Sequence, residues 1–184
     1  LVSACHVVGI TIASAPYHAG RIMGVSLNGT ISACSASGSL SGAGSIGGIT
    51  GYLEGASIDD CRAACAVVGE GGASLCGGLI GEALGLSETI HFCVVTGSVS
   101  GTGTLGAIDG NADGSGFGLA PASYTELYFD KEISVTESLN NVGVGKTTTE
   151  MTTGALTTFS AFDTDIWDIV AGVYPKLKGE PSEA

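Results

Sequence analysis

The chain has 184 residues and a formal net charge of −12, and this composition excludes two classes of partner. It has only 6 Lys and Arg against 18 Asp and Glu, so no basic surface is available for nucleic acid or for an anionic membrane. Although 44% of the residues are hydrophobic, Ser, Thr and Gly interrupt every apolar run before the roughly 18 residues that a membrane-spanning helix needs. We therefore expect neither nucleic-acid binding nor membrane insertion.

The first two thirds of the chain consist of repeats. Each copy has a cysteine three residues after an aliphatic residue, at Cys5, Cys34, Cys61 and Cys93. These cysteines are 29, 27 and 32 residues apart. A five-residue box bounded by glycines recurs at the same period, starting at Gly20, Gly47, Gly77 and Gly106. An altered fifth copy has Leu127 at the cysteine position. A period of this length is typical of solenoids, in which each unit buries its apolar face on its neighbours.

Residues within a copy alternate with a period of two, which indicates β-strands. From Cys34 to Leu40, for example, small apolar residues alternate with serines. Glycines recur every few residues, and we expect them to supply the positive φ angles of the corners between strands. The sequence therefore predicts an all-β fold, a right-handed parallel β-helix of four to five coils over residues 1–130, each about 29 residues long, with a C-terminal capping segment and tail over 131–184.

Equivalent positions of successive coils should stack inside such a solenoid. The predicted core stack comprises Ile31, Ile58 and Ile90 together with Cys5, Cys34, Cys61 and Cys93. We favour buried free thiols, because cysteine packs as a small hydrophobic residue. A disulfide framework remains an alternative, but Cys61 and Cys65 lie four residues apart on one strand, roughly 13 Å, whereas a disulfide tolerates about 7 Å. A zinc site is weaker still, since no second Cys or His pair follows.

The clearest candidate metal site is the acidic loop that begins at Asp109. Oxygen ligands at its first, third and fifth positions followed by a glycine are typical of a calcium loop, and the predicted Ca²⁺ ligands are Asp109, Asn111, Asp113 and Ser115. This loop also lies in the longest connection between copies. However, Ala120 stands where a bidentate acid would complete the motif. An acidic glycine turn without metal is the alternative, and we expect no other cofactor.

Two further motifs have simpler explanations. Asn28-Gly-Thr30 is a candidate glycosylation site in a turn between copies, but we favour the alternative that it is a plain glycine turn. The run from Gly143 to Thr147 is similar to a phosphate-binding loop but lacks its earlier glycine. We instead expect Thr147 to cap a short helix that extends to Met151.

Residues 161–178 differ from the repeats because they are apolar and aromatic, with the only tryptophan of the chain. The candidate contact residues are Phe162, Ile166, Trp167 and Tyr174. The last coil of a solenoid exposes an apolar core and an unpaired strand, so we expect this segment to pack over that coil. The alternative is an assembly surface, where the same aromatic residues would contact another subunit.

The motifs together resemble a known family of bacterial and archaeal surface proteins built from GLUG-motif repeats. The resemblance is carried by Ile31-Ser-Ala-Cys34, Gly38-Ser-Leu-Ser-Gly42 and Gly47-Gly-Ile-Thr-Gly51, and by the same strings around Cys93 and around Gly77 to Gly81. It implies a right-handed β-helix with a capping region, displayed outside the cell and often found in adhesins. It implies no catalytic site.

Three functional classes follow from this reasoning. The first is a non-catalytic extracellular module on the cell surface, an adhesin or stalk, whose partner would be a glycan or protein on a host or neighbouring cell. The second is a fibre subunit that self-associates through the N-terminal coil. The third, a carbohydrate-active β-helix enzyme, needs clustered acidic and basic residues, and the coils offer only Arg21 and Arg62 as cations. The chain opens on Leu1 without a signal peptide, so we expect a processed piece of a larger secreted protein.

Overall fold

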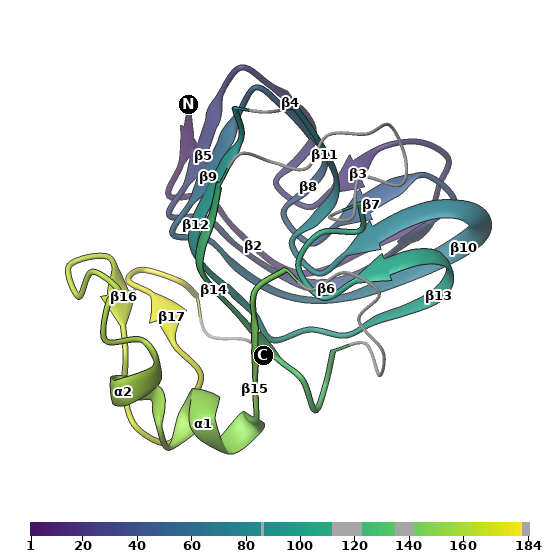
Figure 1. The fold of residues 1–184 in the computed structure, drawn as a ribbon. Coiled ribbons are helices and arrows are strands. Elements are labelled where there is room, and N and C mark those ends of the chain that lie inside the picture. The colour runs from purple at the N-terminus through teal and green to yellow at the C-terminus, as the bar shows by residue number, and fades with distance from the viewer. Residues whose placement is uncertain (86, 112–122, 135–141, 182–184) are drawn as a thin grey trace.

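The computed structural model describes residues 1–85, 87–111, 123–134 and 142–181, and it confirms the β-solenoid (Figure 1). Four coils stack on one another, and a fifth begins with β14. Successive coils pair in parallel; among the described strands, only β16 and β17 pair antiparallel. The solenoid thus buries its apolar residues by repetition of one small unit.

The strands repeat in the same order along the first three coils. The first coil contains β1 (Val2–Ser3), β2 (His6–Ala15), β3 (Ala19–Gly20) and β4 (Met23–Leu27). The second contains β5 (Thr30–Ser32), β6 (Ser35–Gly42), β7 (Ser45–Gly47) and β8 (Thr50–Glu54). The third contains β9 (Ser57–Asp59), β10 (Arg62–Gly77) and β11 (Ile80–Leu84). In the fourth, β12 (Thr89–Val95) and β13 (Val99–Gly106) precede β14 (Ser123–Asp130).

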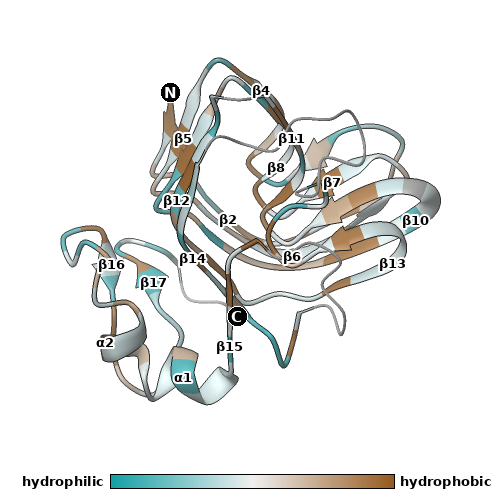
Figure 2. Ribbon diagram, in the orientation of Figure 1, coloured by the Kyte–Doolittle hydropathy of each residue, from teal (hydrophilic) through white to brown (hydrophobic). Residues whose placement is uncertain are grey.

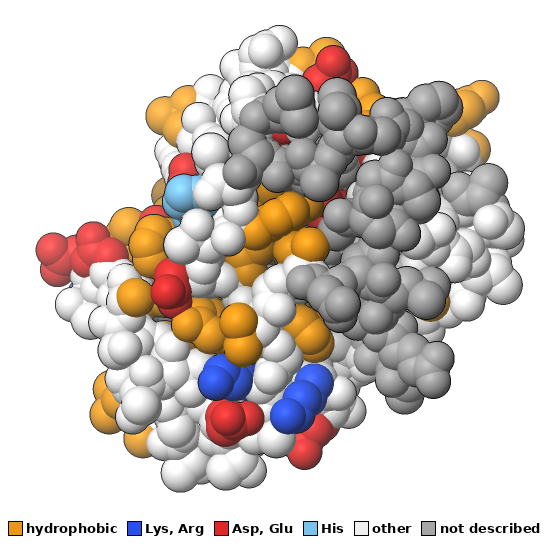
Figure 3. Space-filling view, viewed as in Figure 1, with side chains coloured by type: hydrophobic (Ala, Val, Ile, Leu, Met, Phe, Trp, Pro, Cys, Tyr) orange, Lys and Arg blue, Asp and Glu red, His pale blue; other side chains and the backbone are white. Residues whose placement is uncertain are grey.

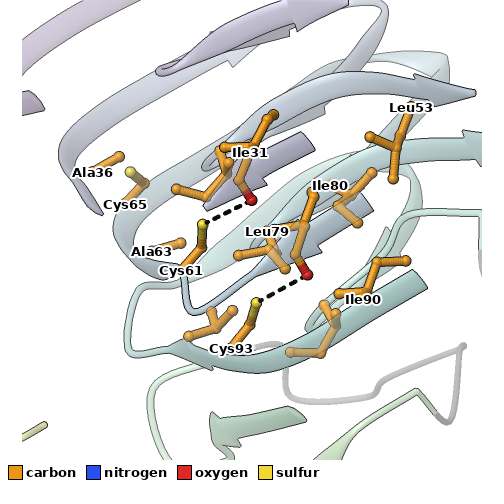
Figure 4. Packing of buried hydrophobic residues seen from close by; sticks show 14 of the residues in the cluster. Ile31, Ala36, Leu53, Cys61, Ala63, Cys65, Leu79, Ile80, Ile90 and Cys93 are labelled. Atoms are coloured by element: carbon orange, nitrogen blue, oxygen red, sulfur yellow. Dashed lines mark hydrogen bonds between the residues drawn. The ribbon is translucent and has the colours of Figure 1, made fainter. Parts of the chain in front are cut away.

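Equivalent residues of successive coils lie directly above one another. Along β1, β5, β9, β12 and β14 the paired column is Val2, Ile31, Ile58, Ile90 and Tyr124. The three isoleucines are fully buried, as are Cys34, Cys61 and Cys93, whereas Cys5 in the first coil is only partly buried. All six cysteines are free thiols. Apolar segments therefore lie at matching places on successive coils (Figure 2), and the isoleucine and cysteine side chains pack together inside them (Figure 4).

The corner before each cysteine is not made by glycine. The residue that precedes the cysteine position has a left-handed backbone in all five coils: Ala4, Ala33, Asp60, Phe92 and Glu126, with φ between 50° and 54°. The expectation that glycines supply the positive φ angles is therefore wrong at this corner, although it is confirmed elsewhere, as at Gly55 between β8 and β9 and at Gly85 after β11. The buried thiol follows the corner and donates a weak hydrogen bond to the carbonyl two residues earlier, at 3.0 Å in the case of Cys93.

The box glycines serve a different purpose, which is close approach between backbones. A Cβ atom on Gly47 would lie 2.2 Å from the carbonyl oxygen of Thr50 and 2.6 Å from the amide nitrogen of Gly81. One on Gly77 would lie 1.9 Å from the carbonyl oxygen of Ile80. No side chain fits at such distances, so the box requires glycine for space.

The C-terminal segment packs beside the coils rather than over their end (Figure 1). It comprises β15 (Val144–Lys146), α1 (Thr148–Thr152), α2 (Ala155–Thr158), β16 (Trp167–Asp168) and β17 (Lys176–Leu177). Its apolar residues form a second core against the outer faces of β12 and β14, and this core includes Val94, Met151, Phe159, Phe162, Trp167 and Leu177. Ile166 and Tyr174 pack against it from its edge. These residues therefore pack on the last coils, as expected, but on their outer flank and not over the open end.

The same burial argues against the aromatic residues as an assembly surface. Trp167 is 1% exposed, and its indole Nε1 donates a hydrogen bond of 2.8 Å to Asp60 Oδ1 in the third coil. Phe162 is 4% exposed and lies edge-on to Phe92, with 5.7 Å between the ring centroids. Their contacts are thus made within the chain, on outward-facing residues of the solenoid.

A shorter piece of the C-terminal segment does cover the end of the sheet. β15 pairs with the outer edge of β14, and Val142 packs against the solenoid core. The residue after β15 is Thr147, which caps α1 by the predicted mechanism: Thr147 Oγ1 accepts from the Glu150 amide, and the Glu150 side chain accepts from the Thr147 amide. This reciprocal pair is a capping box.

The left-handed corners generate a stability prediction. An alanine at positive φ costs about 1 kcal/mol relative to glycine, so Ala33→Gly should raise the free energy of unfolding by up to about 1 kcal/mol, less the added entropy of the unfolded chain. The matched control is Ala36→Gly, three residues later in β6 and 2% exposed, which should lower it. Urea unfolding of both variants measures the difference. Equal destabilisation by the two changes would contradict the strain at Ala33.

Candidate ligand cleft

A cleft of about 500 Å³ lies where β14 and β15 meet the two short helices. Its lining is dominated by hydroxyl and carboxylate groups around one aromatic ring, and comprises Glu126, Tyr128, Lys146, Glu150, Gly154, Thr157, Thr158, Ser160 and Ala161. Near α1, positive and negative side chains lie next to one another on the surface (Figure 3). A volume of this size is within the range of small-molecule sites.

The solenoid side of the cleft is formed by Tyr128 and Glu126. The left-handed corner at Glu126 places Leu127 in the core, so that Tyr128 points outward from β14. The Tyr128 hydroxyl donates a hydrogen bond of 2.6 Å to Glu126 Oε2, and its ring lies edge-on to Phe159 at 5.2 Å between centroids. Burial, followed by the contact with Glu126, raises the pKa of Tyr128 to about 12. The ring is thus held in place and its hydroxyl keeps its proton at neutral pH.

The helical side is organised by the capping box of α1. Glu150 Oε2 accepts hydrogen bonds from the Thr147 amide at 2.8 Å and from Thr147 Oγ1 at 3.0 Å. Lys146 Nζ lies 3.7 Å from Glu150 Oε1. The Thr147 hydrogen bonds, backbone first, lower the pKa of Glu150, so this carboxylate is ionised at neutral pH. The hydroxyl of Thr158 is already engaged with the Glu150 carbonyl oxygen at 3.0 Å.

This arrangement offers several groups that can hold a ligand. Thr157 and Ser160 are exposed in the lining, and together with the two glutamates they can exchange hydrogen bonds with a polyhydroxylated ligand. A glycosidase needs a carboxylic acid that keeps its proton near neutral pH, which requires a raised pKa. Glu150, whose pKa is lowered, does not meet this requirement.

Asp109 of the predicted calcium loop lies inside the end of the solenoid. It is fully buried and forms a bridge with Ile80 of the coil below. Its Oδ1 accepts from the Asn111 amide at 2.9 Å, and its Oδ2 accepts from the Tyr124 hydroxyl at 2.6 Å. Burial is the main cause that raises the pKa of Asp109 to about 7. This aspartate therefore has protein donors on both oxygens.

The calcium site itself stays a prediction. Asn111 is fully buried next to Asp109, but Asp113 and Ser115 lie outside the described residues. Within the described ranges, no group of three or more His, Cys, Asp or Glu side chains could hold a metal ion.

Asn28 lies exposed in the turn between β4 and β5, as predicted, with a left-handed φ of 52°. Its glycosylation is not tested by this geometry.

The sequence analysis identified none of the cleft residues as a site, although one signal pointed to their surroundings. One outward column of the coils reads Ser35, Arg62, Val94 and Tyr128 in successive coils. The residues of this column change from polar in the early coils to apolar in the late ones, and the C-terminal segment covers the apolar part. The cleft lies where this covered face ends.

Comparison of the chain with family models, curated proteins and solved structures finds no match. The resemblance to GLUG-motif proteins therefore rests on the sequence motifs alone and remains a prediction. None of the described helices has the length and apolar character needed to cross a bilayer.

The buried aspartate generates a pH prediction. In the folded chain Asp109 keeps its proton up to about pH 7, whereas its ordinary pKa is 3.8, so the unfolded chain binds fewer protons between these values. Protonated Asp109 therefore stabilises the folded chain relative to the ionised form. This stabilisation is complete below about pH 4, is lost as the pH rises through about 7, and amounts to about 4 kcal/mol at most.

Asp109→Asn should flatten this dependence, which urea unfolding at a series of pH values measures. The control is Asp165→Asn, because Asp165 is exposed in the C-terminal segment. An unchanged pH slope in Asp109→Asn would contradict the assignment.

Proposed function

We propose that the chain is a non-catalytic module of a cell surface, adhesin-like in function, that binds an uncharged glycan through the cleft between β14 and α2. The observation that carries this proposal is the cleft itself, where hydroxyls and carboxylates surround the held ring of Tyr128. Sugars offer the complementary features, since they present both hydroxyl groups and apolar ring faces. The solenoid serves as the rigid support of this site.

The net charge narrows the class of glycan. The chain has a net charge of −12, and its cleft contains two carboxylates and one lysine. An anionic sugar would therefore be repelled. The partner is therefore an uncharged oligosaccharide on a host or neighbouring cell.

An extracellular location is part of the same proposal, and the cysteines are compatible with it. Cys34, Cys61 and Cys93 are fully buried, and burial is the largest cause that raises the pKa of Cys61 well above its usual value. The thiolate is the reactive form of cysteine, so the raised pKa disfavours oxidation and exchange at Cys61. The motif resemblance to surface proteins supports the location independently.

The glycan-binding prediction is tested by obstruction of the cleft. Thr157 is exposed in α2 and lines the cleft, so Thr157→Arg should fill it and weaken binding to uncharged oligosaccharides roughly tenfold or more. The matched control is Thr153→Arg, which adds the same side chain at an exposed position outside the lining. A glycan array followed by calorimetry with the best ligand measures both effects.

Two results would contradict the proposal. One is a wild-type chain that binds no uncharged glycan on the array or by calorimetry. The other is equal binding by the wild-type chain and by Thr157→Arg, which would place the ligand elsewhere on the surface.

A further inference from the structure

The three inner cysteines of the repeat have the same surroundings. Cys34, Cys61 and Cys93 lie at equivalent positions of the second, third and fourth coils, and each is fully buried. Each sulfur contacts the carbonyl oxygen two residues earlier, at 3.2, 3.3 and 3.0 Å respectively. Each also approaches a carbonyl of the coil before it. Cys61 Sγ lies 3.8 Å from the Ile31 oxygen, and Cys93 Sγ lies 4.0 Å from the Ile58 oxygen (Figure 4). The thiols therefore repeat with the step from one coil to the next.

Cys61 stands between two other thiols. It is within hydrogen-bonding reach of Cys34 in the coil before it and of Cys93 in the coil after it. Cys5 extends the same column, but there the Cys34 sulfur meets the backbone amide of Cys5, at 3.4 Å. The continuous part of the column thus consists of three thiols, and Cys61 is common to both neighbouring pairs.

The spacing of the coils decides what can join two of these thiols. Neighbouring strands of a sheet lie roughly 4.8 Å apart, so equivalent Cβ and Sγ atoms of the column are separated by a similar distance. A disulfide needs Cβ atoms about 3.5 to 4.5 Å apart and sulfurs about 2.05 Å apart, which is closer than this spacing. Two metal–thiolate bonds of roughly 2.3 Å placed in line span about 4.6 Å. A single ion held between two sulfurs therefore fits the spacing of the column.

The number of ligands selects the class of ion. Soft sulfur ligands favour copper(I), zinc and iron–sulfur clusters. Structural zinc and iron–sulfur clusters are usually held by four protein ligands. In the part of the chain that the structure describes, no group of three or more His, Cys, Asp or Glu side chains could hold such a metal. Copper(I) accepts two sulfurs in line, so it is the ion of this class that the column suits.

We propose that copper(I) binds within this column, in linear coordination by Cys61 and either Cys34 or Cys93. The ion displaces the proton of one thiol, which leaves to solvent, and a sulfur lone pair of the neighbouring thiol supplies the second bond. The ion and the thiolate then have no net charge together. This neutrality matters because burial is the largest cause that raises the pKa of Cys61, so a thiolate without a cation is disfavoured there. The site is independent of the proposed glycan binding, since the cleft is lined by other residues.

Anaerobic titration with copper(I), in competition with the chelator bicinchoninate, tests the proposal. Because the thiols are buried, an ion enters only when the coils open locally, so each mixture is left until its absorbance is constant. We expect the wild-type chain to withdraw copper(I) from the chelator. Cys61→Ala removes the thiol shared by both pairs and should weaken this binding roughly tenfold or more. The matched control is Cys76→Ala, which removes another fully buried thiol whose neighbours in adjacent coils are Ile46 and Leu105. This control should bind copper(I) as the wild type does.

X-ray absorption of the wild-type chain loaded with one equivalent of copper(I) identifies the ligands without any variant. We expect two sulfur neighbours and no nitrogen or oxygen. A wild type that withdraws no copper(I), equal weakening by the two variants, or a copper ion with three or more ligands would each overturn the proposal, as would a nitrogen or oxygen ligand. Circular dichroism verifies that both variants remain folded; if Cys61→Ala unfolds, the X-ray absorption of the wild type decides.

Discussion

The structure depends on a place where two backbone segments touch with no side chain between them. At the glycine boxes the chain turns so tightly that a single methyl group would overlap carbonyl oxygens of the same coil or backbone atoms of the next one, as at Gly47 and Gly77. The box recurs once per coil, so each coil makes the same close backbone contact at the equivalent position. This common geometry keeps the coils in register, and the register in turn places like residues over like.

The columns inside the solenoid follow from that register, and they change character at both ends. At the position after the first box glycine the column reads Arg21, Gly48, Gly78 and Ala107, so the first coil has a guanidinium where the inner coils have almost no side chain. Arg21 is 7% exposed, and its Nη1 donates to the Ser39 carbonyl at 2.9 Å. Its Nε and Nη2 have no hydrogen-bond partner among the residues that the structure describes. At the other end Asp109 continues the column of Ile80. Arg21 in the first coil and Asp109 in the fourth thus place charged side-chain types at positions where the neighbouring coil has Gly48 or Ile80.

Sequence reasoning found the repeat and the cap at Thr147, and it missed the left-handed corners, the place of the C-terminal segment and the cleft. The period, the strand class and the inward positions of Ile31 and Cys34 were predictable because each position can be compared across four copies. The left-handed corners were not, since Ala33, Asp60 and Phe92 share no property except their place before a cysteine. The position of Trp167 was also missed, because a nonrepeating segment gives no register, and only the apolar outward residues Val94 and Tyr128 indicated the flank it covers. The cleft forms between such a segment and the repeats, so its residues are far apart in sequence and carry no common motif.

The C-terminal segment has a mechanical consequence. It holds three neighbouring coils from the side, through Trp167 on Asp60 in the third coil, Phe162 on Phe92 in the fourth and Phe159 on Tyr128 in β14. An array of coils that touch only their neighbours can be peeled apart one coil at a time. Here, a pulling force on the last strand is shared with two coils beneath it, so that end of the rod has to yield as a unit. The first two coils have no such lateral brace among the contacts described. The rod is consequently stiff at one end and compliant at the other.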